Sequence, residues 1–245
     1  MSVRSVRQIF LNSKDKDENY SSNTNFNSNM RFYLNQPIHI PPNYNLSVAL
    51  INFQCPISWG NINSYNNTLT INGNTQTVDT GNYNITELID ELNTKFTGIA
   101  SFTNDSNTNK TTITITSSQN PNTLEGSMLE VLGFYFYTPT NNSVIESDGI
   151  CDLSGFRYLV LRTNFHTKNV SSFSKRPMNI LAHIPINNDD YLSYVQTDNK
   201  FLVNNKDVNF IDIMLQTPDH KDINLRGVHF SLTLELDFIK KEEES

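Results

Sequence analysis

The side chains that most often perform catalysis or bind metal ions are scattered along this sequence. Each histidine stands alone among apolar or loop residues, with no second histidine or cysteine at the spacing of a metal site. The histidines are His39, His166, His183, His220 and His229. Phosphate-binding glycine loops, the nucleophile elbow of hydrolases and the zinc-protease helix motif are all absent. The sequence therefore predicts a protein that is not an enzyme and uses no cofactor and no metal.

One stretch imitates a calcium-binding loop. Residues 105–109, DSNTN, match the first half of such a loop. Its sixth position needs glycine and its twelfth needs a bidentate glutamate, but Lys110 and Thr116 stand there. We predict a hairpin loop between two strands instead.

The composition limits the classes of function. The chain has 245 residues, with 18 Lys and Arg against 25 Asp and Glu, so its net charge of −7 disfavours a broad nucleic-acid-binding surface. Asparagine accounts for 36 residues, which favours short strands joined by many loops. The start of the chain has no apolar stretch typical of a signal peptide, and no apolar run is long enough to span a membrane. We expect synthesis in the cytoplasm of a cell, with Cys55 and Cys151 reduced.

Most of the chain has the pattern of β-strands. Short apolar and aromatic stretches follow one another from Met30 onward, separated by turn residues. They span residues 30–40, 46–59, 67–71, 99–103, 111–118, 156–165, 178–186, 191–196, 200–203, 208–217 and 228–238. Apolar and polar residues alternate over 228–238, as in a strand with one buried face. The alternation over 207–215 changes phase near Phe210, so we predict a β-bulge there.

One segment has helical spacing. Over residues 84–97 the apolar side chains recur at intervals of three and four. Asn82 or Asn84 can cap its start, and Gly98 follows where a left-handed residue is favoured. The sequence thus predicts an all-β fold, an antiparallel sandwich with one inserted α-helix at about 84–97.

The first 29 residues differ from the rest. A short apolar segment precedes the polar residues 12–29, so we predict an extended N-terminal arm over 1–29 and a single domain over 30–245. We find no linker and no insertion long enough for a separate projecting domain. The arm is expected to order on assembly and to contact neighbouring molecules, nucleic acid or another anionic partner; the alternative is a solvated terminus. Its predicted contact residues are Arg4, Arg7, Ile9, Phe10 and Leu11.

The order of four stretches carries a resemblance to a known family. They are a short strand and polar turn over 9–27 before MRFYLNQPI, a Gly-Asn-Tyr turn and helix over 78–97, a hairpin over 99–116 leading to MLEVLGF, and a closing series of strands from FRYLVLRTNF to VHFSLTLELDF. In this order they resemble the penton-type jelly-roll capsid proteins of virophages and Polinton-like viruses, relatives of minor capsid proteins of large eukaryotic DNA viruses. The resemblance covers nearly the whole chain.

The resemblance implies a jelly-roll β-sandwich that acts as a structural protein of a virion. It implies a homopentamer at the icosahedral fivefold vertices, in contact with double-jelly-roll major capsid proteins and with neighbouring minor capsid proteins. Two other functions remain open at this point. One is an attachment protein that binds glycans through exposed side chains such as Tyr65 and Tyr191, and the other is a minor cement protein of the capsid. A jelly-roll enzyme of the cupin type is disfavoured, because the chain lacks clustered histidines.

Overall fold

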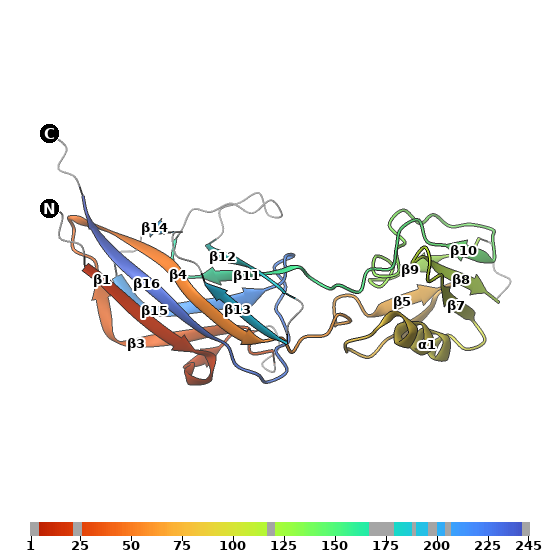
Figure 1. Cartoon of the computed structure of the whole chain (residues 1–245), viewed down its shortest axis with the longest axis horizontal. Coiled ribbons are helices and arrows are strands. Elements are labelled where there is room, and N and C mark those ends of the chain that lie inside the picture. Colours follow the sequence, from red (N-terminus) through yellow and green to blue (C-terminus); the bar gives the residue numbers. More distant parts are fainter. Residues whose placement is uncertain are drawn as a thin grey trace. The chain divides into compact units, whose positions relative to one another are not determined.

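The computed structural model describes most of the chain as β-strands joined by turns. The described residues are 5–21, 26–116, 121–166, 179–187, 190–195, 200–203 and 207–241. The contacts divide the chain into two units (Figure 1). Unit 1 consists of Met1–Ser58 with Phe156–Ser245, and unit 2 consists of Trp59–Gly155. Unit 2 is therefore an insertion into unit 1.

This division differs from the single domain that we predicted over 30–245. The sequence showed no insertion long enough for a separate domain, yet Trp59–Gly155 forms a unit of its own. The physical reason is that the connections next to Ser58 and Gly155 carry no long polar linker, and stretches with strand patterns occur on both sides of each. The boundaries of unit 2 therefore cannot be predicted from the local sequence pattern.

Unit 1 contains two antiparallel sheets. The first runs in the order β1, β16, β4 and β13, with β14 also paired to β4. Its strands are β1 (Ser5–Asn12), β16 (Ser231–Lys240), β4 (Tyr44–Pro56), β13 (Tyr191–Val195) and β14 (Phe201–Val203). The second runs in the order β12, β11, β15, β3 and β2. Its strands are β12 (Ile180–Pro185), β11 (Tyr158–Thr163), β15 (Asp207–Gln216), β3 (Asn29–His39) and β2 (Glu18–Asn19).

The strand order of unit 1 is that of a jelly roll. The last two strands each lie between two strands from earlier in the chain: β16 between β1 and β4, and β15 between β3 and β11. Two such nested Greek keys, shared between two sheets, define the jelly-roll fold. The predicted fold class, an antiparallel jelly-roll sandwich with one inserted helix, is confirmed.

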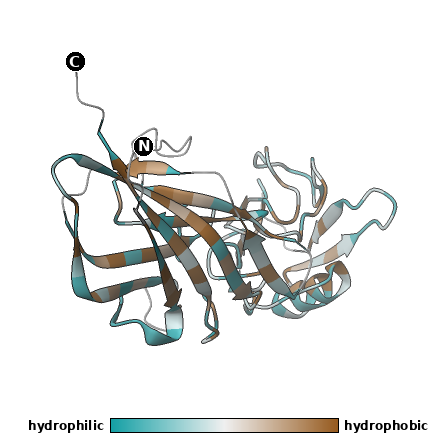
Figure 2. Ribbon diagram, turned by 60° about the vertical axis from the view of Figure 1, so that its left-hand side comes forward, coloured by the Kyte–Doolittle hydropathy of each residue, from teal (hydrophilic) through white to brown (hydrophobic). Residues whose placement is uncertain are grey.

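Alternating side chains form the core of unit 1. On β16 the fully buried Leu232, Leu234 and Leu236 face the other sheet, and Figure 2 shows the alternation as bands along the strands. The ring of Phe53 stacks on Phe230 with 5.6 Å between centroids. On β15 the register shifts between Val208 and Phe210, which confirms the predicted bulge.

The first strand differs from the predicted arm. All eight residues of β1 pair with β16, from Ser5 opposite Phe238 to Asn12 opposite Ser231. A short 3-10 helix, η1 (Ser13–Asp15), follows at once. Ser13 donates its backbone N–H to the Phe230 carbonyl and accepts from the Phe230 N–H, both at 2.9 Å. The start of the chain is thus part of the sheet, and its partner comes from the other end of the sequence.

Unit 2 has two small sheets and one helix. Its sheets run β10, β8, β7 and β6, β5, β9. The elements are β5 (Thr68–Ile71), β6 (Asn74–Thr77), α1 (Ile85–Lys95), β7 (Ala100–Asn104), β8 (Thr111–Ile115), β9 (Leu124–Glu125) and β10 (Val144–Glu146). The hairpin of β7 and β8 encloses residues 105–110, so the predicted hairpin loop is confirmed.

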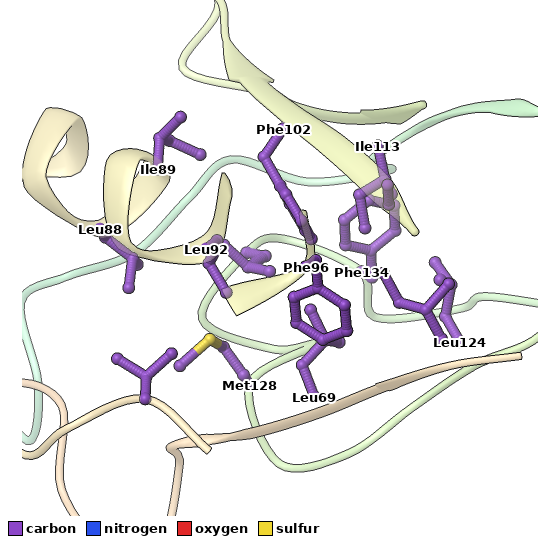
Figure 3. Packing of buried hydrophobic residues seen from close by; sticks show 14 of the residues in the cluster. Leu69, Leu88, Ile89, Leu92, Phe96, Phe102, Ile113, Leu124, Met128 and Phe134 are labelled. Carbon is purple, nitrogen blue, oxygen red and sulfur yellow. The ribbon is translucent and has the colours of Figure 1, made fainter. Parts of the chain in front are cut away.

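The helix forms as its sequence predicts. Asn84 caps it: its side chain accepts from the Glu87 N–H, and the Glu87 carboxylate accepts from the Asn84 N–H, both at 3.0 Å. Gly98 follows with φ of +78°. The apolar face, with Leu88, Leu92 and Phe96 fully buried, meets the core of unit 2 (Figure 3). Among the described residues, no helix is long and apolar enough to cross a membrane.

Candidate interaction surface

The residues predicted as arm contacts lie on two sides of β1. Arg4 lies outside the described residues. Ile9 and Leu11 face the core opposite Leu234 and Leu232. Leu11 is 8% exposed and Ile9 is half-buried, so Leu11 offers little surface to a neighbouring molecule while β1 stays in the sheet. An assembly role for both residues stays a prediction.

The other two predicted contacts, Arg7 and Phe10, are both exposed but lie on opposite faces of β1. The Arg7 guanidinium lies 5.8 Å from the centroid of the Phe238 ring, within the range of a cation–π contact. Phe10 points the other way, toward solvent, and 74% of its surface is exposed. An assembly role for Arg7 and Phe10 stays a prediction.

A groove lies beside Phe10 on the outer face of the first sheet. It has a volume of about 420 Å³ and is formed by η1 and by residues from β1, β4 and β16. Its walls are Phe10, Leu11, Asn12, Asp15, Asn52, Gln54, Ser231, Leu232 and Thr233. The groove therefore combines one exposed aromatic ring with amides, hydroxyls and a carboxylate.

The polar walls of this groove were not predicted from the sequence. Asn52 and Gln54 alternate along β4, and Ser231 and Thr233 alternate along β16, with Asn52 opposite Thr233 and Gln54 opposite Ser231. Alternation within each strand was the signal that these residues share the solvent face. The pairing of the two strands, which brings the four side chains together, could not be read from the sequence.

The far edge of the same sheet carries exposed apolar side chains. Val195 on β13 is 67% exposed, and Leu202 on β14 is 60% exposed. Tyr191, one of the predicted glycan contacts, lies on this edge and donates its hydroxyl to Gln54 Oε1 at 3.5 Å. The other, Tyr65, lies in unit 2. Val195 lies opposite Asn52 and Leu202 opposite Ser47, so both residues lie along the same edge of β4.

An ion network lies between these two edges. Lys200 donates to Glu235 Oε1 at 2.7 Å and to Asp237 Oδ2 at 3.1 Å. These hydrogen bonds raise the pKa of Lys200. The network also explains why Asp237, on the outer face of β16, is only 2% exposed. The alternation of 228–238 is therefore a less strict guide to exposure than the sequence predicted.

Two of the histidines, His39 and His183, each contact one neighbouring side chain. The His39 ring Nδ1 lies 2.8 Å from Asp207 Oδ1, and the His183 ring packs against Tyr158 with 5.0 Å between centroids. Across the described ranges, no three His, Cys, Asp or Glu side chains come together as a metal site would require.

Comparison with known proteins finds similarity to solved structures. No family model matches this chain, and no curated protein matches it. The structure is similar to the mavirus penton protein. That similarity covers 98% of this chain and 100% of the crystallised mavirus chain, with 13% identical residues and a TM-score of 0.48. The jelly-roll assignment itself comes from the strand order of unit 1.

Proposed function

We propose that this protein is a structural protein of a virus capsid, namely the penton that occupies the fivefold vertices as a homopentamer. The observation that carries the proposal is the strand order of unit 1, a jelly roll of two antiparallel sheets of the type from which viral capsids are built. The order of sequence motifs described above, which resembles that of penton-type capsid proteins, narrows the role from capsid protein to penton. The protein then resides in the virion after synthesis in the host cytoplasm.

The partners follow from the same role. A ring of five copies needs a heterologous contact, in which one surface of a protomer meets a different surface of the next. The exposed Val195 and Leu202 at the far edge of the first sheet supply an apolar surface for one side of that contact. The outer rim of the ring would meet double-jelly-roll major capsid proteins and neighbouring minor capsid proteins.

The solution mass of the purified protein tests the proposal. Light scattering should give five times the chain mass of 28.0 kDa, and negative-stain images of the same sample should show fivefold rings. A trimer would contradict the penton role and favour an attachment protein. A monomer that also fails to bind capsids lacking this protein would contradict it as well.

Two matched variants locate the contact. Val195→Asp places a charge on the exposed edge of the first sheet and should dissociate the ring. Val144→Asp is its control, because Val144 is also exposed, at 55%, but lies in unit 2. If both variants remain pentameric, the far edge is not the contact; if both dissociate, the effect is not specific to that edge.

A further inference from the structure

We propose that the groove beside Phe10 binds a neutral saccharide unit, with the Phe10 ring as its stacking surface. The groove lies on the outer face of the first sheet of unit 1, and every residue that lines it belongs to the described part of the chain. Its volume of about 420 Å³ falls in the range of small-molecule sites. This proposal is independent of the penton role.

Phe10 supplies an aromatic face that the fold does not use. Its neighbours in β1, Ile9 and Leu11, pack toward the core, while 74% of the Phe10 surface is exposed. Exposing a phenyl ring forgoes the free energy of burying it. The face of such a ring is electron-rich, so it attracts the weakly positive C–H groups on the flat side of a pyranose ring.

The amide groups of the groove are oriented by their neighbours. Thr233 Oγ1 donates to Asn52 Oδ1 at 3.1 Å, and the Tyr191 hydroxyl donates to Gln54 Oε1 at 3.5 Å. Each amide oxygen accepts one of these hydrogen bonds and keeps a second lone pair, so a ligand can meet both NH₂ groups as donors and both oxygens as acceptors. The groove thus offers at least two amide donors on one side.

The other polar groups complete a set suited to alcohols. The Ser231 hydroxyl both donates and accepts, and the Asp15 carboxylate only accepts. A sugar hydroxyl also does both: it accepts from an amide NH₂ and donates to a carboxylate. Adjacent hydroxyl groups on one sugar can therefore engage Asn52 or Gln54 together with Asp15.

The charge of the groove selects among saccharides. Its lining contains one carboxylate, Asp15, and no lysine or arginine. An anionic sugar, such as a sialic acid or a sulfated unit, would meet a like charge without a compensating cation. The ligand class is therefore a neutral hexose or N-acetylhexosamine.

The test uses the full-length protein in the oligomeric state in which it is purified. Saturation-transfer NMR with glucose, galactose, mannose and N-acetylglucosamine, each tested alone, should show transfer to at least one sugar. A glycan microarray then extends the test to oligosaccharides. Signals confined to sialylated or sulfated glycans would overturn the proposal, as would binding to none.

Variants assign the binding to the groove. Phe10→Ala and Gln54→Leu should each weaken binding of the responding sugar by about tenfold, the loss expected for one stacking or one hydrogen-bonding contact. Matched controls in unit 2 are Phe136→Ala, at a ring that is 86% exposed, and Gln76→Leu. The controls should leave the affinity unchanged.

Two results would separate this inference from the proposed function. If Phe10→Ala and Gln54→Leu bind the sugar as well as the natural protein does, the site lies elsewhere and the inference is wrong. A protein that forms pentamers but binds no saccharide would contradict the inference alone and leave the penton role standing.

Discussion

Arg31 shows how one side chain ties neighbouring strands together. Its guanidinium, on β3, donates to both carboxylate oxygens of Asp212 on β15, at 2.7 and 2.9 Å. The same group lies 3.9 Å from the centroid of the Phe210 ring and 4.9 Å from that of Tyr20. The hydrogen bonds to Asp212 raise the pKa of Arg31, so its charge is permanent.

We expect Arg31→Lys to lower the free energy of unfolding by about 1–2 kcal/mol, although it keeps the charge. Lysine cannot form the paired hydrogen bonds to Asp212, nor can it stack flat on Phe210. Urea unfolding of the natural and variant proteins measures the difference. Arg7→Lys is the control, because Arg7 is exposed and its cation–π contact with Phe238 is one that lysine can also make. An equal loss there would mean that the paired hydrogen bonds of Arg31 are not the cause.

Burial changes the chemistry of the two cysteine thiols. Both cysteines are free and buried, Cys55 in unit 1 and Cys151 in unit 2. Burial raises the pKa of Cys55 from 9.0 to about 12, and burial with Asp152 nearby raises that of Cys151 from 9.0 to about 11. The reactive thiolate is therefore scarce at neutral pH in the folded protein.

We predict that Ellman's reagent labels the native protein far more slowly than the protein in urea. The single variants Cys55→Ala and Cys151→Ala assign each rate to one thiol. Raising the pH should also lower stability between about 9 and 12, because the unfolded chain releases its thiol protons first. Rapid labelling of a native thiol at neutral pH would contradict this account.

Residues 5–12 can be described either as part of a mobile arm or as the strand β1, and the two descriptions predict different effects of mutations. If these residues formed a mobile arm, substituting any of their side chains would leave the free energy of unfolding nearly unchanged. In the sheet, Leu11 is 8% exposed and contacts β16, whereas its neighbour Phe10 faces solvent. The two adjacent residues therefore test whether the strand is formed.

Leu11→Ala should lower the free energy of unfolding by about 2 kcal/mol, because it leaves a cavity between the sheets. Phe10→Ala should change it by no more than about 0.5 kcal/mol. Thermal and urea unfolding of the two variants measure both values. Equal, small effects would show that β1 leaves the sheet in solution and would restore the predicted arm.

The strands were the most predictable elements. Each of the eleven stretches predicted as strands contains a strand in the structure, since buried side chains impose period two on the sequence. The strands that were missed are very short or lack that pattern: β6 reads Asn-Thr-Gln-Thr, and β9 has two residues. For β1 only the family resemblance indicated a short strand, beginning at Ile9. The local pattern did not predict it, because only Ile9 and Leu11 face the core, too few to establish alternation before the polar stretch begins.

The division into two units could not be predicted from local sequence patterns. Nothing in the sequence around Ser58 or Gly155 distinguishes a turn between two strands from the connection to a second unit. The groove could not be predicted from local sequence patterns either. Phe10 and Gln54 come from strands that meet only through β16, so their proximity depends on the whole jelly roll.

For the molecule as a whole, we predict that residues 59–155 fold when expressed alone. The buried core of unit 2 consists of residues from within 62–145, including Leu92, Phe102 and Phe134. An isolated unit should therefore give dispersed NMR signals and a cooperative thermal transition. Leu92→Ala should lower its free energy of unfolding by about 3 kcal/mol. A broad, non-cooperative transition would show that unit 2 depends on unit 1.

The pairing of β1 with β16 sets an order of events during translation. The ribosome makes β1 first, but its only partner strand among the described residues, β16, is made after nearly all of the remaining chain. The first sheet therefore stays open until β16 has been made, while unit 2 can close around its own nearby contacts much earlier. Until then the nascent jelly roll presents unpaired strand edges, so mutations in β16 should lower yield more than equally destabilising mutations in unit 2.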